Sequence, residues 1–178
     1  MPGAFFKDLF ARDDPMGAAL VEVPFFQDLS RRELREVGQS LQKQTYASGK
    51  PVFEQGRPGM GMYVVLSGRV EICRNDEDGT RLQLGEVGPG EFFGELALLD
   101  DSARTASALA AEETELVAFT RANLLNFAED RPHIGVKVLM HLSQIVAERL
   151  RRANRALKEA RDDLEAAEDE PEAESDTQ

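Results

Sequence analysis

A glutamate and an arginine follow two glycines in the stretch from Pro89 to Ala110, P-G-E-F-F-G-E-L-A-L-L-D-D-S-A-R-T-A-S-A-L-A. Gly90 and Gly94 flank two aromatic residues, a pattern that predicts a strand end turning sharply into one turn of helix. Backbone N–H groups at such a helix start attract an anion. Arg104 comes nine positions after Glu95, and its guanidinium pairs with phosphate oxygens. A carboxylate that accepts from a hydroxyl and a guanidinium that binds phosphate suit a ribose phosphate.

The string G-E-L-A-L-L, followed at this distance by R-T-A, resembles the phosphate-binding cassette of cyclic-nucleotide-binding domains. Such domains occur in the regulatory subunits of cyclic-nucleotide-dependent kinases and in the bacterial catabolite activator family. The resemblance implies that Glu95 and the Gly94 backbone hold the ribose 2′-hydroxyl, and that Arg104 and nearby backbone amides hold the cyclic phosphate. Many members carry proline where this chain has Ala103, which we expect to loosen the loop without removing a contact. The full set assigned to the ligand is Gly94, Glu95, Leu96, Ala97, Arg104, Thr105 and Ala106.

The same residues also allow a purely structural interpretation. Gly94 and Glu95 could simply make a turn, and Arg104 could pair with Asp100 or Asp101. For an isolated glycine–glutamate pair or an isolated arginine this interpretation would suffice. The whole string at this spacing favours the nucleotide site.

The sequence gives little information about which nucleotide base is bound. Leu66, Val70 and Leu82 are candidates to line it, although each also fits ordinary core packing. Thr105 resembles members in which a hydroxyl at this position contacts guanine, whereas other members with serine or threonine there bind the adenine nucleotide. We expect cAMP, with cGMP as the alternative, as a ligand rather than as a cofactor.

The apolar pattern changes along the chain from helical to alternating and back. Ser30 followed by Glu33 is a capping box that starts a helix. From Gln44 to about Phe119, short apolar runs between closely spaced glycines indicate an antiparallel roll. We therefore expect an α+β fold, a jelly-roll-like antiparallel β-roll with short N-terminal helices and a long C-terminal helix. Strands are expected at 44–46, 51–53, 62–66, 70–74, 82–87, 106–110 and 115–120.

Four regions follow from this pattern. They are N-terminal helices at 1–43, the β-roll at 44–120 with the phosphate cassette at 89–107, C-terminal helices at 121–166 with a dimerisation seam, and a disordered acidic tail at 167–178. In the first region the aromatic residues Phe5, Phe6 and Phe10 recur with Leu9 at helical spacing. This short helix is expected to dock on its own domain, the alternative being a partner or a membrane.

The last helix is expected to begin at Pro132 and to have two halves. A wide apolar face from Ile134 to Val146 should lie on the roll and close over the nucleotide. Beyond it, a narrow seam predicts a parallel homodimer, the alternative being a solvated helix that frays after Leu150. A basic cluster on this helix is better explained by ion pairs with neighbouring acidic residues than by DNA. The seam repeats every seven residues as Leu150, Leu157 and Leu164, with Ala153, Ala160 and Ala167 between them.

The formal net charge of -12 at pH 7 argues against nucleic acid or an anionic membrane as a general partner. Cys73 is the only cysteine, so no internal disulfide and no oxidising compartment is indicated. The N-terminus does not resemble a signal peptide, and no apolar run approaches the roughly 20 residues that span a bilayer. These features favour the cytoplasm.

Enzymatic activity is not expected. Rolls of this shape also form metal enzymes, but metal ligation there requires several histidines or carboxylates inside the barrel. Both histidines, His133 and His141, follow the strands, and no Ser/His/Asp arrangement is present. We therefore expect neither catalytic residues nor metal ligands.

The resemblance and the seam together suggest a function. No helix-turn-helix follows the long helix in this sequence, so a stand-alone cyclic-nucleotide sensor is expected, homodimeric and signalling to an unknown effector protein. The alternative is a scaffold or interaction module with the same roll that no longer binds nucleotide. Direct titration with nucleotide separates the two.

Overall fold

The computed structural model describes residues 20–76 and 78–168, with side chains as far as Asp163. The chain divides into two units, and each is described by itself. The roll unit comprises the described residues up to His141, and the helix unit runs from Leu142 to Glu168. The expected aromatic helix at residues 5–10 and most of the acidic tail lie outside the described residues.

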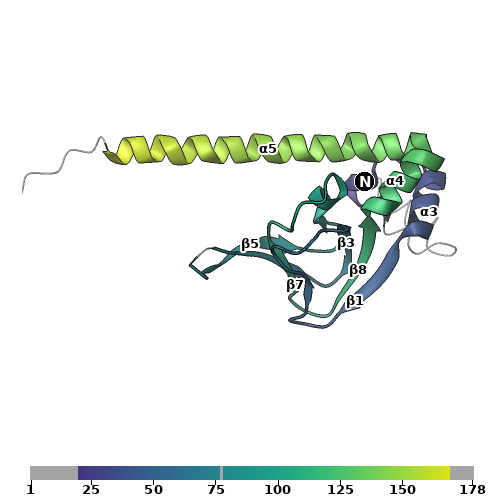
Figure 1. The fold of residues 1–178 in the computed structure, drawn as a ribbon, viewed down its shortest axis with the longest axis horizontal. Helices are drawn as coiled ribbons and strands as arrows, with labels where there is room; N and C mark the ends of the chain where they lie inside the picture. The colour runs from purple at the N-terminus through teal and green to yellow at the C-terminus, as the bar shows by residue number, and fades with distance from the viewer. Residues whose placement is uncertain (1–19, 77, 169–178) are drawn as a thin grey trace, which may run out of the picture. The chain divides into compact units, whose positions relative to one another are not determined.

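The roll consists of two four-stranded antiparallel sheets, with strand orders β1-β8-β3-β6 and β2-β7-β4-β5 (Figure 1). A core of buried apolar side chains, among them Val65, Phe93 and Leu116, is contributed by both sheets. This is the expected α+β roll. The strands are β1 Gln42–Tyr46, β2 Pro51–Phe53, β3 Gly61–Ser67, β4 Val70–Asn75, β5 Arg81–Val87, β6 Phe92–Phe93, β7 Ser107–Ala110 and β8 Thr114–Thr120.

Six of the seven predicted strands differ from the observed ones by one or two residues at one end or both. Strand β1 starts at Gln42 rather than Gln44, because polar side chains at a sheet edge carry no apolar signal. Strand β6 was not predicted at all, since Phe92–Phe93 is too short to show an alternating pattern. It pairs with Tyr63 and Val64 of β3 and lies within the cassette, directly before Gly94.

Helical segments precede and follow the roll. The capping box at Ser30 is confirmed. The Ser30 hydroxyl accepts from the Glu33 backbone N–H, and the Ser30 backbone N–H donates to the Glu33 carboxylate. A second capping box, between Thr120 and Asn123, was not anticipated. The segments are the 3₁₀ turn η1 Pro24–Phe26, α3 Arg31–Ser40, α4 Arg121–Asp130 and α5 Pro132–Glu168.

An ionic cluster joins α3 to the first residues of α5 within the roll unit. The buried Glu33 carboxylate accepts two hydrogen bonds of 2.9 Å from Lys137 Nζ, and His133 Nε2 lies 3.8 Å from it. Burial alone would raise the pKa of Glu33, but hydrogen bonds from Lys137 and Ser30 lower it to about 2. Glu33 therefore caps α3 and also anchors α5.

The helix unit is a single helical segment that continues past Leu150 to Glu168 (Figure 1). Leu150 and Leu157 have 60% and 72% of their surface exposed. The expected ion pairs are present: Glu148 lies within 3.1 Å of Arg151 and of Arg152. No helix within residues 20–76 and 78–168 is long and apolar enough to cross a membrane.

Candidate functional site

Arg104 is the centre of the candidate site, and it lies on the loop between the 3₁₀ turn η2, Glu95–Leu98, and β7. Two backbone hydrogen bonds of 2.8 Å, Gly56 N–H to Arg104 O and Arg104 N–H to Arg57 O, hold this loop against the loop after β2. Ala103 and Pro58 form an isolated antiparallel β-bridge beside these hydrogen bonds. The arginine backbone is thereby fixed, and only 8% of the residue's surface is exposed.

The Arg104 guanidinium is held by backbone carbonyls and an aromatic ring. Nη1 donates to Gly94 O at 2.9 Å and Nη2 donates to Gly61 O at 2.7 Å. Cζ lies 3.9 Å from the centre of the Phe53 ring, close enough for a cation–π interaction. None of these contacts neutralises the charge of the guanidinium.

The interpretation in which Arg104 pairs with Asp100 or Asp101 is wrong. Asp101 Oδ1 instead accepts from Arg121 Nη1 at 2.8 Å, and Asp100 accepts from the backbone and hydroxyl of Ser102. Both aspartates therefore have other partners, and the Arg104 side chain contacts Gly94, Gly61 and Phe53 instead.

The hydrogen-bonding capacity of the Arg104 side chain is not fully used. Its Nε atom is buried and has no hydrogen-bond partner among the described residues. Burial lowers the pKa of Arg104 from its ordinary value, and the nearby Tyr63 and Glu95 oppose that shift. Because an arginine keeps its proton in proteins, the site is a buried cation with a donor that an anion would satisfy.

Gly94 makes the sharp turn at the start of the cassette. Its φ of +77° is in the left-handed region, and a Cβ added there would lie 2.6 Å from Arg104 Nη1. A side chain at this position would therefore displace the guanidinium. Gly59 is similarly constrained, since a Cβ there would lie 2.6 Å from Ala97 Cβ and 3.3 Å from Arg104 Cζ.

The other residues assigned to the ligand surround this turn. Glu95 and Ala97 are buried at 1% and 5% exposure within η2, whereas Leu96 is 44% exposed. Thr105 is exposed, and Ala106 is half-buried just before β7. The structure brings Gly94 against the Arg104 side chain, and contacts of the assigned residues with a nucleotide stay a prediction.

Several residues of the site were not predicted. Phe53, Tyr63 and Phe93 form an aromatic cluster with ring centres 5.6 to 6.0 Å apart, and Phe53 lies under the guanidinium. The two glycines of the Gly59–Gly61 segment were the available signal, since glycine often marks a close approach between backbone segments. Their partner could not be identified from spacing alone.

The three residues predicted as candidates to line the base differ in how far they are buried. Val70 is fully buried in the core, and Leu66 is half-buried. Leu82 on β5 is 46% exposed, and Leu84 on the same strand is 52% exposed. The interpretation of Leu82 as a core residue is therefore wrong. Strand β5 therefore presents exposed apolar side chains.

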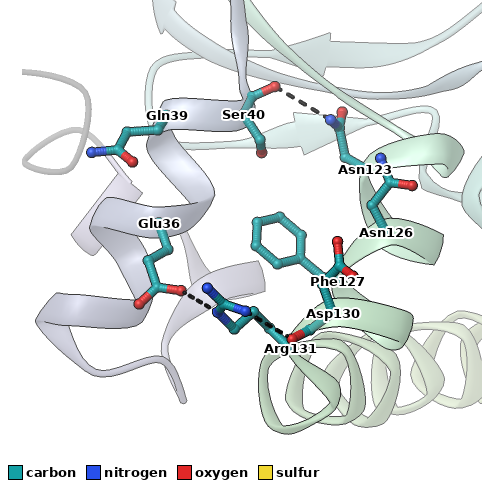
Figure 2. A pocket seen from close by; sticks show the side chains of 8 residues that line it. All are labelled: Glu36, Gln39, Ser40, Asn123, Asn126, Phe127, Asp130 and Arg131. Atoms are coloured by element: carbon teal, nitrogen blue, oxygen red, sulfur yellow. Dashed lines mark hydrogen bonds and ion pairs between the residues drawn. The ribbon is translucent and has the colours of Figure 1, made fainter.

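A separate cavity of about 350 Å³ lies between α3 and α4 and does not include Arg104. In Figure 2 Phe127 points into it, an ion pair of 3.3 Å between Glu36 and Arg131 crosses its rim, and Asn123 donates to Ser40 O. Among the described residues, no group of three or more His, Cys, Asp or Glu side chains could hold a metal ion. The cavity lining is Glu36, Gln39, Ser40, Asn123, Asn126, Phe127, Asp130 and Arg131.

Comparisons with known proteins agree with the roll and its cassette. The family model of the cyclic nucleotide-binding domain matches residues 43–131, half of the chain. The Cyclic AMP receptor protein of Thermus thermophilus is 39% identical over 131 residues, 74% of this chain and 59% of that protein. The CRP-like cAMP-activated global transcriptional regulator of Mycobacterium tuberculosis is 34% identical over 80% of this chain and 62% of that protein. This chain belongs to the cyclic nucleotide-binding domain family.

The same similarity is seen among solved structures. The catabolite activator protein of T. thermophilus superposes with a TM-score of 0.70 at 38% identity, over 76% of this chain and 62% of that one. The family expected from the cassette is thereby confirmed. This chain spans about three-fifths of the length of the curated relatives described above.

Proposed function

We propose that this chain is a sensor that binds a cyclic mononucleotide, with cAMP preferred to cGMP. The observation that carries the proposal is the buried Arg104 cation, whose Nε donor has no protein partner among the described residues. The two relatives add support for the ligand, since one is named a cyclic AMP receptor and the other a cAMP-activated regulator. A phosphate with one negative charge matches a single buried guanidinium.

In this proposal each assigned residue has a distinct role. The Glu95 carboxylate and the Gly94 backbone bind the ribose 2′-hydroxyl, and Leu96 and Ala97 contribute the backbone of η2. Arg104 binds the cyclic phosphate, and Thr105 and Ala106 bring backbone amides to the same oxygens. The exposed leucines of β5, Leu82 and Leu84, offer apolar surface for the base.

Thermal melting with a panel of nucleotides tests the proposal. We expect cAMP to raise the melting temperature, with a shift that grows with the logarithm of its concentration above Kd, because a ligand that binds only the folded state stabilises it. Linear 5′-AMP, which lacks the cyclic diester, is the matched control and should have little effect. A competition in which cGMP binds tenfold or more tightly than cAMP would contradict the base preference. No stabilisation by any cyclic nucleotide would instead favour the scaffold interpretation.

The signal is proposed to leave through α5 as a contact with a protein partner. The chain is proposed to act as a homodimer, because the exposed Leu150 and Leu157 lie seven residues apart on one face of the helix unit. The expectations of no catalytic role, no nucleic acid partner and a cytoplasmic location stay predictions.

Replacing Leu157 by glutamate should convert the dimer to monomers. The change places like charges on an apolar seam and removes a leucine that is 72% exposed in the single chain, so the roll itself should be unaffected. Light scattering at tens of micromolar measures the result, with Lys158→Ala, which changes the adjacent residue outside the seam, as the control. A parent chain that is already monomeric would contradict the dimer and leave the nucleotide site untouched.

A further inference from the structure

The two hydrogen bonds of the Arg104 guanidinium go to uncharged groups, although the guanidinium is a buried cation. Nη1 and Nη2 donate to the carbonyls of Gly94 and Gly61, at 2.9 and 2.7 Å. Burial disfavours the charged form and lowers the pKa of Arg104, and the nearby Tyr63 and Glu95 oppose that shift without reversing it. A further group that favours positive charge is therefore expected beside the guanidinium.

The face of the Phe53 ring meets this requirement. Arg104 Cζ lies over the ring, 3.9 Å from its centre. The face of an aromatic ring carries the negative part of its quadrupole, so it attracts a cation, most strongly where water is excluded. The same ring reaches the turn at the start of the cassette, since a Cβ added to Gly94 would lie 3.3 Å from Phe53 Cε1. One side chain thus lies beside both the turn and the cation of the cassette.

The fold holds Phe53 in this place from both sheets. Strand β2 changes register against β7 between Pro51 and Phe53, and irregularities of this kind re-aim side chains. The Phe53 ring packs against Tyr63 of β3 and Phe93 of β6, with 6.0 and 5.7 Å between ring centres. Strands β3 and β6 belong to one sheet and β2 to the other. The ring under the guanidinium is therefore fixed by its neighbours.

A cation–π contact contributes less once the cation has an anionic partner. A phosphate that pairs with Arg104 would cancel much of the positive field that the ring face attracts. The ring should therefore stabilise the free chain more than the nucleotide-bound chain. A group that favours the free state in this way lowers the affinity for the ligand by the difference between its two contributions.

We infer that Phe53 is a positioning residue of the nucleotide site, whose ring acts as the counter-charge of Arg104 until a phosphate replaces it in that role. The ring keeps the guanidinium in its binding place in the free chain, and part of this stabilisation is lost when the ligand binds. The part of the inference that concerns the ligand rests on the proposed function. The part that concerns the free chain does not depend on it.

Fluorinated phenylalanines at position 53 of the full-length chain test the inference. Replacing one, two or three ring hydrogens by fluorine makes the ring face progressively less negative and changes the size of the ring little. We expect the unfolding equilibrium constant of the free chain, measured by chemical denaturation, to rise stepwise, by about two- to thirty-fold at three fluorines. The Kd for cAMP, measured by calorimetry, should fall stepwise over the same series by a smaller factor.

Two controls separate the charge of the ring face from the shape of the ring. The same fluorine series at Phe93, in the same aromatic cluster, measures what fluorine does to ring packing alone. The series at position 53 is also repeated in Arg104→Ala. No cation lies over the ring in that variant, so the stepwise loss of stability should disappear.

Unfolding constants that follow the Phe93 series, or a trend that persists in Arg104→Ala, would show that the Phe53 ring only packs and would overturn the inference. A Kd for cAMP that stays constant or rises with fluorination would show that the ring serves the bound state equally or better, and would overturn it as well. If the parent chain binds no cyclic nucleotide, the proposed function fails and the ligand part of the inference fails with it. The denaturation series needs no ligand, so it then decides the part that concerns the free chain by itself.

Discussion

Replacing Arg104 by alanine should abolish the stabilisation of the folded chain by cAMP. Arg104 is 8% exposed and its Nε has no hydrogen-bond partner among the described residues, so in the variant a bound phosphate would lose its main charged partner. Losing a buried charge-assisted contact costs about 2 to 5 kcal/mol, or about 30-fold to several thousand-fold in Kd. The dissociation constant measured by calorimetry checks this directly.

Arg69→Ala is the matched control for this prediction. The Arg69 side chain is 63% exposed and lies 3.4 Å from Glu86 on the surface, so its removal should leave cAMP binding unchanged. Arg104→Lys keeps the charge but loses the planar donor set, and we expect intermediate affinity. Equal binding by Arg104→Ala and the parent would show that the cassette does not hold the phosphate.

Replacing Glu33 by alanine should lower the free energy of unfolding by about 2 to 4 kcal/mol, because it removes the carboxylate half of the α3 capping box, which accepts from the Ser30 N–H, and leaves Lys137 without its carboxylate. Chemical denaturation at pH 7 measures the difference. The control is Glu36→Ala on the same helix. Glu36 takes part in ion pairs of 3.3 Å with the exposed Arg32 and Arg131, so we expect a loss within about 1 kcal/mol.

The Glu33 contribution should depend on pH in a defined direction. Hydrogen bonds from Lys137 and Ser30 outweigh the effect of burial and lower the pKa of Glu33 from 4.5 to about 2 in the folded chain. A carboxylate with a lowered pKa stabilises the fold above the unfolded pKa, and this stabilisation is lost as pH falls toward the folded pKa. The difference between parent and Glu33→Gln should therefore shrink by up to about 3 kcal/mol between pH 6 and pH 2. A difference independent of pH would contradict the assignment.

The local features of the site could be predicted from the sequence. The turn at Gly94, the short helix from Glu95 and the cap at Ser30 each depend on residues within a few positions of one another. Such local geometry depends on the backbone conformations that individual residue types prefer, so it can be predicted from residue types and their spacing. The roll followed from the same signals repeated along the chain.

The partners of Arg104 could not be predicted in this way. Gly61 O lies 43 positions earlier in the chain, and Phe53 comes from another strand. Which backbone carbonyl meets a guanidinium depends on strand register between distant segments, which no local pattern encodes. The pairing of Glu33 with Lys137, 104 positions apart, was missed for the same reason.

Direct calorimetric titration of the unmodified full chain with cAMP tests the central claim most directly. The proposed site is complete within one chain, since Gly94, Glu95 and Arg104 all belong to the roll unit. We predict saturable binding at one nucleotide per chain, with cGMP competing more weakly and 5′-AMP competing little. Absence of saturable binding of any cyclic mononucleotide at millimolar concentration, by a chain that melts cooperatively, would contradict the proposed function.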